Sequence, residues 1–347
     1  MLTSLAFIFL VGLSLAAICQ ALKLPRIIGM LLTGILLGPY VLDVLDPSIL
    51  SISSELRQIA LIIILLKAGL SLNLADLKKV GRPAIMMSCI PATFEILAYF
   101  LLAPYFLGIT RLEAAVMGAV MGAVSPAVVV PRMVQLMDEK YGTAKSIPQM
   151  ILAGASCDDI YVIVLFSTFS TMAQGGSAHV KDFINIPVSI VLGIVLGSVT
   201  GYLLSLFFET AYAHSHMVRN SMKVIVVMGV SFLLMSIETW LKPVVSISGL
   251  LAVVSMACVL KLKCTPSVSA RLSQKFGKLW LAAEVLLFVL VGASVDIRYT
   301  LKAGPAALAM IFAALLFRTL GVTLCVAGTN LTAKEKLFCS IAYLPKA

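Results

Sequence analysis

The chain has 347 residues, of which 61% are hydrophobic and 12% are charged, and its mean hydropathy is +1.07. A soluble globular domain is about half apolar and about a quarter charged. The composition therefore excludes that class and indicates an all-α, multi-pass membrane protein. The formal net charge of +10 comes mostly from short loops between apolar segments, so it bears on membrane orientation and predicts no nucleic-acid binding.

Apolar segments of roughly membrane-spanning length follow one another along the whole sequence. We predict eleven complete spans, at residues 2–21, 27–42, 58–73, 84–107, 112–136, 147–172, 184–208, 221–240, 245–262, 277–295 and 303–327. A twelfth begins near Lys336 and is cut by the end of the sequence, so we expect the natural C-terminus to lie further on. The first span lacks a basic leader and a cleavage signal, which predicts a retained helix.

Basic residues are concentrated in the loops that follow odd-numbered spans, such as those holding Arg82, Lys145 and Lys334. The loops after even-numbered spans hold few, for example Arg111 and Lys242. The positive-inside rule then predicts that the odd loops are cytoplasmic and the N-terminus is outside. We expect a plasma or inner membrane as the location.

Cysteine and histidine give no pattern typical of a metal centre. The seven cysteines lie mostly inside spans and are expected to pack as small apolar residues. His214 and His216 form the one close histidine pair, but two ligands do not make a zinc site, and a solvated loop is the better interpretation. We therefore expect no enzyme activity and no cofactor.

Ionisable residues inside the predicted spans are few, and acids and bases occur in comparable numbers. They are Lys67, Glu95, Asp158, Asp159, Glu284, Arg318 and Lys346. Such charges are costly in a membrane and usually pair within the protein. For Lys67, Glu284 and Lys346 the alternative is a structural ion pair, or a position near a helix end from which the side chain reaches the interface.

Asp158 and Asp159 are adjacent carboxylates near the middle of an apolar segment at residues 147–172. Two like charges side by side repel, which favours protonation of one of them near neutral pH. The pair therefore predicts a site, formed by Asp159 and Asp158, where a monovalent cation competes with a proton.

Prolines interrupt the preceding span at Pro126 and Pro131, and a further break falls at Pro345. Proline removes a helix hydrogen-bond donor and clashes with the preceding turn. We expect unwound backbone there, whose carbonyls are good ligands for a hard cation. The alternative is an ordinary proline kink.

Several motifs together resemble the cation/proton antiporter superfamily and, within it, its NHA-type sodium/proton antiporter branch. They are Leu24–Gly29 with Gly34–Pro39, Leu56–Leu70, Gly122–Pro131, Ala155–Ile160 and Tyr343–Ala347. The resemblance implies a 13-helix inverted-repeat antiporter fold with broken crossing helices, of which the final helices are cut or missing here. It also implies a homodimer.

The resemblance further implies a division into scaffold and core helices. Scaffold (dimer) helices would occupy residues 1–83 and 173–302, the latter with a linker. Core, ion-transporting helices would occupy residues 84–172 in the first repeat and 303–347 in the incomplete second repeat.

By resemblance, Asp159 is the principal carrier of cation and proton, Asp158 assists, and Ser125 lies where the broken helices cross. Arg318 stands where electrogenic bacterial relatives have a lysine, and Glu95 matches a glutamate that pairs with this arginine. We thus predict a Glu95–Arg318 salt bridge, and a weaker pairing of Glu284 with Lys346 or Lys67. The double aspartate suggests electrogenic exchange and the arginine suggests electroneutral exchange, so the stoichiometry stays open.

The predicted function is secondary active Na⁺(Li⁺)/H⁺ antiport by alternating access. A K⁺/H⁺ antiporter and a sodium-coupled organic-anion symporter of related fold are the alternatives within transport. A non-transporting membrane receptor or assembly subunit is the alternative from another class, and it would need no buried acidic pair.

Overall fold

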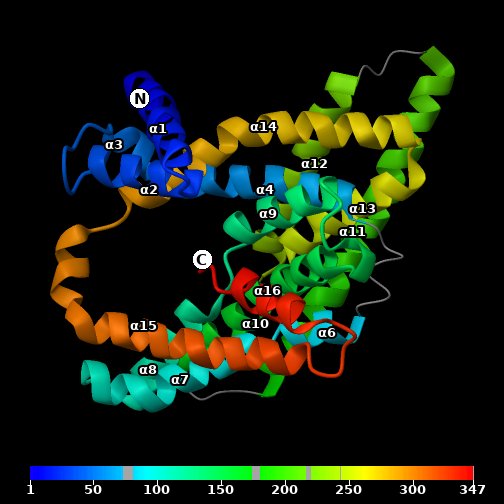
Figure 1. The fold of residues 1–347 in the computed structure, drawn as a ribbon. Coiled ribbons are helices and arrows are strands. Elements are labelled where there is room, and N and C mark those ends of the chain that lie inside the picture. Colours follow the sequence, from blue (N-terminus) through cyan, green and yellow to red (C-terminus); the bar gives the residue numbers. More distant parts are fainter. Residues whose placement is uncertain (73–80, 174–179, 216–219, 243, 347) are drawn as a thin grey trace. The chain divides into compact units, whose positions relative to one another are not determined.

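The computed structural model describes the chain except residues 73–80, 174–179, 216–219, 243 and 347, and the regular elements of this described part are helices (Figure 1). The first helices are α1 (Leu2–Ala21), α2 (Arg26–Leu37), α3 (Pro47–Ser51), α4 (Ser53–Ser71), α6 (Gly81–Met87), α7 (Ile90–Leu107), α8 (Arg111–Gly122) and α9 (Pro126–Asp138). The short 3-10 helix η1 (Thr143–Lys145), α10 (Ile147–Ala173), α11 (Val180–Ser215), α12 (Asn220–Leu241), α13 (Gly249–Lys263), α14 (Pro266–Ala293), α15 (Ile297–Cys325) and α16 (Ala333–Ala342) follow.

Seven helices of the described part are long and apolar enough to cross a membrane, and they include α1, α10, α12 and α14. Several predicted spans fall short of this length for local reasons. The predicted span 112–136 is two helices, α8 and α9, and α13 has only 15 residues because Ser248 caps its start by accepting from the Leu251 amide. Breaks and caps, which apolar content alone does not reveal, set these lengths.

The chain forms two compact units. Unit 1 comprises Met1–Ile64 and Gln274–Gly304, and unit 2 comprises Leu65–Ser273 and Pro305–Ala347. One boundary falls at Gly304, whose φ of +65° interrupts α15 immediately before Pro305. The division into scaffold and core helices is functional, and it remains a prediction.

In unit 1, glycines allow α2 to pack closely against its neighbours. A Cβ on Gly34 would lie 1.9 Å from the Val289 carbonyl oxygen of α14, and one on Gly29 would lie 2.4 Å from the Leu15 carbonyl oxygen of α1. Small residues of this kind let helix backbones approach in membranes, where van der Waals packing drives association.

In unit 2, α11 and α13 pack along a row of glycines spaced four residues apart. Gly193, Gly197 and Gly201 face α13 so closely that a Cβ on Gly197 would lie 2.1 Å from the Ala252 carbonyl oxygen. This is the small-xxx-small pattern of close helix pairs.

The break between α8 and α9 in unit 2 meets the segment that follows α16. The extended segment between α8 and α9 pairs with the segment after α16 through an antiparallel bridge between Val124 and Lys346. In this bridge the Ser125 amide donates to the Pro345 carbonyl at 3.0 Å. The pairing agrees with the predicted crossing, in which the broken helix formed by α8 and α9 meets the segment around Pro345.

The prolines contribute differently from the prediction. Pro126 occupies the first turn of α9, where its missing amide costs nothing. Pro131 lies inside α9, which continues through it, so the expectation of a second break there is wrong. A single lost hydrogen bond is tolerated in an apolar helix when neighbouring groups compensate for it.

Candidate functional site

Both aspartates lie in α10, and adjacent positions of a helix face different surroundings. Asp158 is fully buried, whereas Asp159 is partly exposed. The two carboxylates are therefore not equivalent, which their sequence alone does not reveal.

Asp158 faces the crossing of the broken helices. Its Oδ2 accepts a hydrogen bond from the Val124 amide at 2.8 Å and lies 3.6 Å from Nη2 of Arg318. Its other oxygen, Oδ1, has no hydrogen-bond partner among the described residues. Asp158 thus contacts the segment between α8 and α9 and the Arg318 side chain of α15 through Oδ2, and its Oδ1 is left without a described partner.

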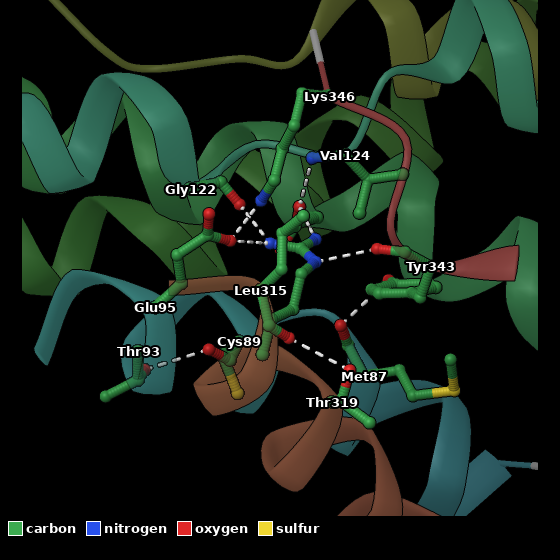
Figure 2. A network of polar contacts seen from close by, with 12 residues as sticks. Met87, Cys89, Thr93, Glu95, Gly122, Val124, Leu315, Thr319, Tyr343 and Lys346 are labelled. Carbon is green, nitrogen blue, oxygen red and sulfur yellow. Dashed lines mark hydrogen bonds and ion pairs between the residues drawn. The ribbon is translucent and has the colours of Figure 1, made fainter. Parts of the chain in front are cut away.

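Arg318 is fully buried and joins three separate segments. Its Nη1 donates to Glu95 Oε2 of α7 at 2.6 Å and to the Gly122 carbonyl at the end of α8 at 2.7 Å. Its Nε donates to the Tyr343 carbonyl, just after α16, at 2.7 Å. The predicted salt bridge between Glu95 and Arg318 is confirmed, and Figure 2 shows Glu95, Gly122 and Tyr343 gathered in this network.

Lys346 also pairs with Glu95 Oε2, and its side chain points inward toward it (Figure 2). Its interpretation as a residue that reaches the membrane interface is therefore wrong. Lys67 lies 3.5 Å from Asp138, and the predicted pairing of Glu284 with Lys346 or Lys67 would join the two units and stays a prediction. Lys346 shares the Glu95 carboxylate with Arg318, because a cation that is mostly buried needs an acidic partner nearby.

Tyr343 supports this network, and the sequence analysis did not single it out. Its hydroxyl donates to the Met87 carbonyl at 2.8 Å, and the Arg318 guanidinium lies 5.3 Å from its ring centroid. A Cβ on Gly154, one turn before Asp158 in α10, would lie 2.7 Å from the Tyr343 hydroxyl. The sequence signal for this role was a tyrosine two positions before Pro345, because the hydroxyl of a buried tyrosine usually finds a hydrogen-bond partner.

Asp159 makes no hydrogen bond or ion pair with any residue that the structure describes. Glu95 and Asp158 pair with the two cations of Arg318 and Lys346, and Asp159 adds a third carboxylate next to Asp158 in the chain. With every group ionised, one negative charge is unmatched, and Asp159 carries it. A proton or one monovalent cation at Asp159 would make the cluster neutral.

The donor set is one of oxygens. Among the described residues no three His, Cys, Asp or Glu side chains are grouped as for a transition metal. His214 lies within α11 and not in the expected loop, and His216 is outside the described residues. Carboxylate and carbonyl oxygens are the ligands that hard cations prefer, so this donor set suits a hard cation. Ser125 contributes its backbone at the crossing and makes no side-chain cap to α9.

A protein-family model described as "Sodium/hydrogen exchanger, transmembrane" matches residues 5–347. The chain belongs to this family. It is similar to sodium/hydrogen exchanger 9B2 of Homo sapiens, with 34% identity over 333 residues that cover 93% of this chain and 59% of the relative. Sodium/hydrogen exchanger 9B1 of Homo sapiens is 30% identical over 336 residues, covering 93% of this chain and 62% of the relative. The chain thus spans about three fifths of the length of these curated relatives.

Among solved structures, the chain resembles the sodium proton antiporter MjNhaP1 from Methanocaldococcus jannaschii. The TM-score is 0.77 with 23% identity, and the match covers 99% of this chain and 84% of that one. This similarity confirms the fold class, an all-helical antiporter fold.

Proposed function

We propose that this chain is the membrane part of a Na⁺(Li⁺)/H⁺ antiporter in which cation and proton compete for Asp159, with Asp158 beside it. The observation that carries the proposal is the partly exposed Asp159 carboxylate, which has no described partner and adjoins a cluster whose other charges are matched. Family membership supports Na⁺ and H⁺ as the exchanged ions, because the relatives are named sodium/hydrogen exchangers.

The charge balance supports electroneutral exchange. Arg318 and Lys346 offset Glu95 and Asp158, so Asp159 alone needs a neutralising partner. An arginine is effectively never deprotonated, so Arg318 cannot carry a transported proton. One cation therefore replaces one proton in each cycle.

Neutralisation of the cluster permits the movement that transport requires. An uncompensated charge is expensive inside an apolar barrier, whereas the cluster with Na⁺ or H⁺ bound carries no net charge. We propose that core helices within 84–172 and 303–347 then move against scaffold helices within 1–83 and 173–302, giving alternating access. Glu95, Arg318, Lys346 and the crossing at Ser125, Pro126 and Pro345 hold the site together during this movement.

Further parts of the proposal rest on the same residues. The double aspartate, together with the Glu95–Arg318 pair, favours the NHA-type branch. The distribution of basic residues favours an N-terminus outside, and the plasma or inner membrane is the proposed location, with a homodimer as the assembly.

Flux measurements in proteoliposomes test the proposal. A pH-sensitive dye trapped inside should report proton movement driven by Na⁺ or Li⁺ gradients, with no change when the membrane potential is clamped. Flux driven by K⁺ alone would instead assign the K⁺/H⁺ alternative, and uptake of an organic anion with Na⁺ would assign the symporter. Absence of any cation-dependent flux would contradict transport.

A further inference from the structure

A cavity separate from the aspartate site lies in unit 2 where three chain segments meet. Its volume is about 380 Å³, and it is lined by the start of α6, by η1 with the start of α10, and by the loop between α15 and α16. The residues that matter here are Arg82, Lys145, Ser146, Asn330, Pro83 and Met150.

The cavity is basic and holds no acid. Arg82 and Lys145 are both exposed and line it, and none of its lining residues is aspartate or glutamate. Arg82 forms no ion pair with any residue in the described ranges. Lys145 has one acidic partner, Glu335 at 2.7 Å, which is outside the lining. Two cationic side chains therefore line one cavity, and of the two only Lys145 has a carboxylate partner among the described residues.

Neutral donors and an apolar wall complete the lining. The Asn330 side chain is exposed and makes no hydrogen bond with the described residues, and Ser146 contributes to the wall beside Lys145. Pro83 and Met150 add apolar surface. Such a lining suits a ligand with an oxygen-rich anionic end and a short carbon part.

We propose that this cavity binds the phosphate group of a phosphate ester. An arginine presents a planar fork of donors that matches phosphate oxygens in a bidentate manner, and a lysine adds a compact charge. The apolar wall leaves room for the esterified carbon group.

The position of the cavity is consistent with two sources of that group. Arg82 and Lys145 come from loops after odd-numbered spans, which we propose to be cytoplasmic. That side faces both soluble phosphate esters and a leaflet rich in anionic phospholipids. The shared chemistry is the phosphate ester, and the experiment below separates the two sources.

The test measures the melting temperature of the purified protein in a maltoside detergent as a probe is added at constant ionic strength. The probes are inorganic phosphate, glycerol phosphate and dioctanoyl phosphatidate, with dioctanoylglycerol as the lipid that lacks phosphate. We expect at least one phosphate-bearing probe to raise the melting temperature and dioctanoylglycerol to leave it unchanged. A response to phosphatidate alone assigns a lipid source, and a response to glycerol phosphate assigns a soluble one.

Variants connect the response to the cavity. Arg82→Gln should raise the concentration needed for the same shift about tenfold or more, because one charge-assisted contact is lost. Arg82→Lys should give an intermediate result, which keeps the test valid if Arg82→Gln folds poorly. Arg132→Gln is the matched control, since Arg132 is exposed on α9, bonds Gln135 of its own helix at 2.6 Å and does not line the cavity.

Three results would overturn the proposal. They are no shift with any phosphate-bearing probe, an unchanged response in both Arg82 variants, and an equal loss of response in Arg132→Gln. The last would indicate a general effect of surface charge.

Discussion

Arg318 Nη1 lies 2.6 Å from Glu95 Oε2, and both side chains are at most 1% exposed. Removing one partner of such a pair leaves an uncompensated buried charge, which costs about 3–5 kcal/mol. We expect Glu95→Ala and Arg318→Ala each to lower the unfolding free energy by about that amount. The double variant should lose clearly less than the sum of the two, measured by denaturation in detergent. Simple additivity would show that the pair does not stabilise the protein as proposed.

The two aspartates should respond differently to amidation. Asp159→Asn removes the unmatched carboxylate and should abolish Na⁺-dependent proton flux in proteoliposomes while the protein still folds. Asp158→Asn keeps an acceptor oxygen for the Val124 amide but removes one negative charge. The cluster is then neutral without a cation, so Na⁺ binding should weaken.

The size of the second effect follows from electrostatics. Two opposite unit charges about 8 Å apart attract each other by about 2 kcal/mol at an effective dielectric constant of about 20. Losing that attraction between a carboxylate and a bound cation corresponds to more than about a tenfold loss of cation affinity. We therefore expect the half-saturating Na⁺ concentration of Asp158→Asn to rise more than tenfold. Full flux at ordinary Na⁺ concentrations in Asp159→Asn would refute the assignment of the carrier.

Gly154 and Tyr343 should be coupled. A methyl group on Gly154 would press on the Tyr343 hydroxyl at 2.7 Å, so Gly154→Ala should destabilise the protein by about 1–3 kcal/mol. Tyr343→Phe leaves the buried Met87 carbonyl without its donor, which also costs about 1–3 kcal/mol. In the double variant the phenyl ring relieves part of the clash, so its loss in melting temperature should be smaller than the sum. A larger loss would mean that the contact with Met87 Cβ dominates instead.

The pair of Lys67 and Asp138 should contribute little to stability. Their side chains are 22% and 56% exposed and their charged atoms are 3.5 Å apart. Exposed pairs of this kind contribute about 0–1 kcal/mol. Lys67→Gln should therefore change the unfolding free energy by less than about 1 kcal/mol, measured beside Arg318→Ala under the same conditions. A loss as large as that of Arg318→Ala would mean that Lys67 has a second, stronger role.

Much of the fold could be predicted from the sequence because apolar length and proline position have direct structural consequences. The crossing of the broken helices followed from Pro126 and Pro345, and the Glu95–Arg318 pair followed from the scarcity of charges in the spans together with the family resemblance. The unbroken helix at Pro131 could not be predicted, because whether a helix breaks at a proline depends on neighbouring groups that compensate for the lost hydrogen-bond donor.

The finer features of the site depend on contacts between residues far apart in the chain. Nothing in the local sequence shows that Lys346 points inward to Glu95, or that Tyr343 reaches the Met87 carbonyl 256 residues away. Likewise, adjacency in sequence makes Asp158 and Asp159 look equivalent, and only packing around α10 separates them.

The donor that holds Asp158 is the backbone N–H of Val124. A peptide N–H does not titrate at any physiological acidity, so this anchor is the same whether the surroundings are acidic or alkaline. Side-chain replacement at residue 124 also leaves it in place, unless the newcomer is proline. Val124 is itself fully buried, so packing restricts its side chain to compact apolar groups, and the hydrogen bond to Asp158 additionally excludes proline, the one residue without an amide hydrogen.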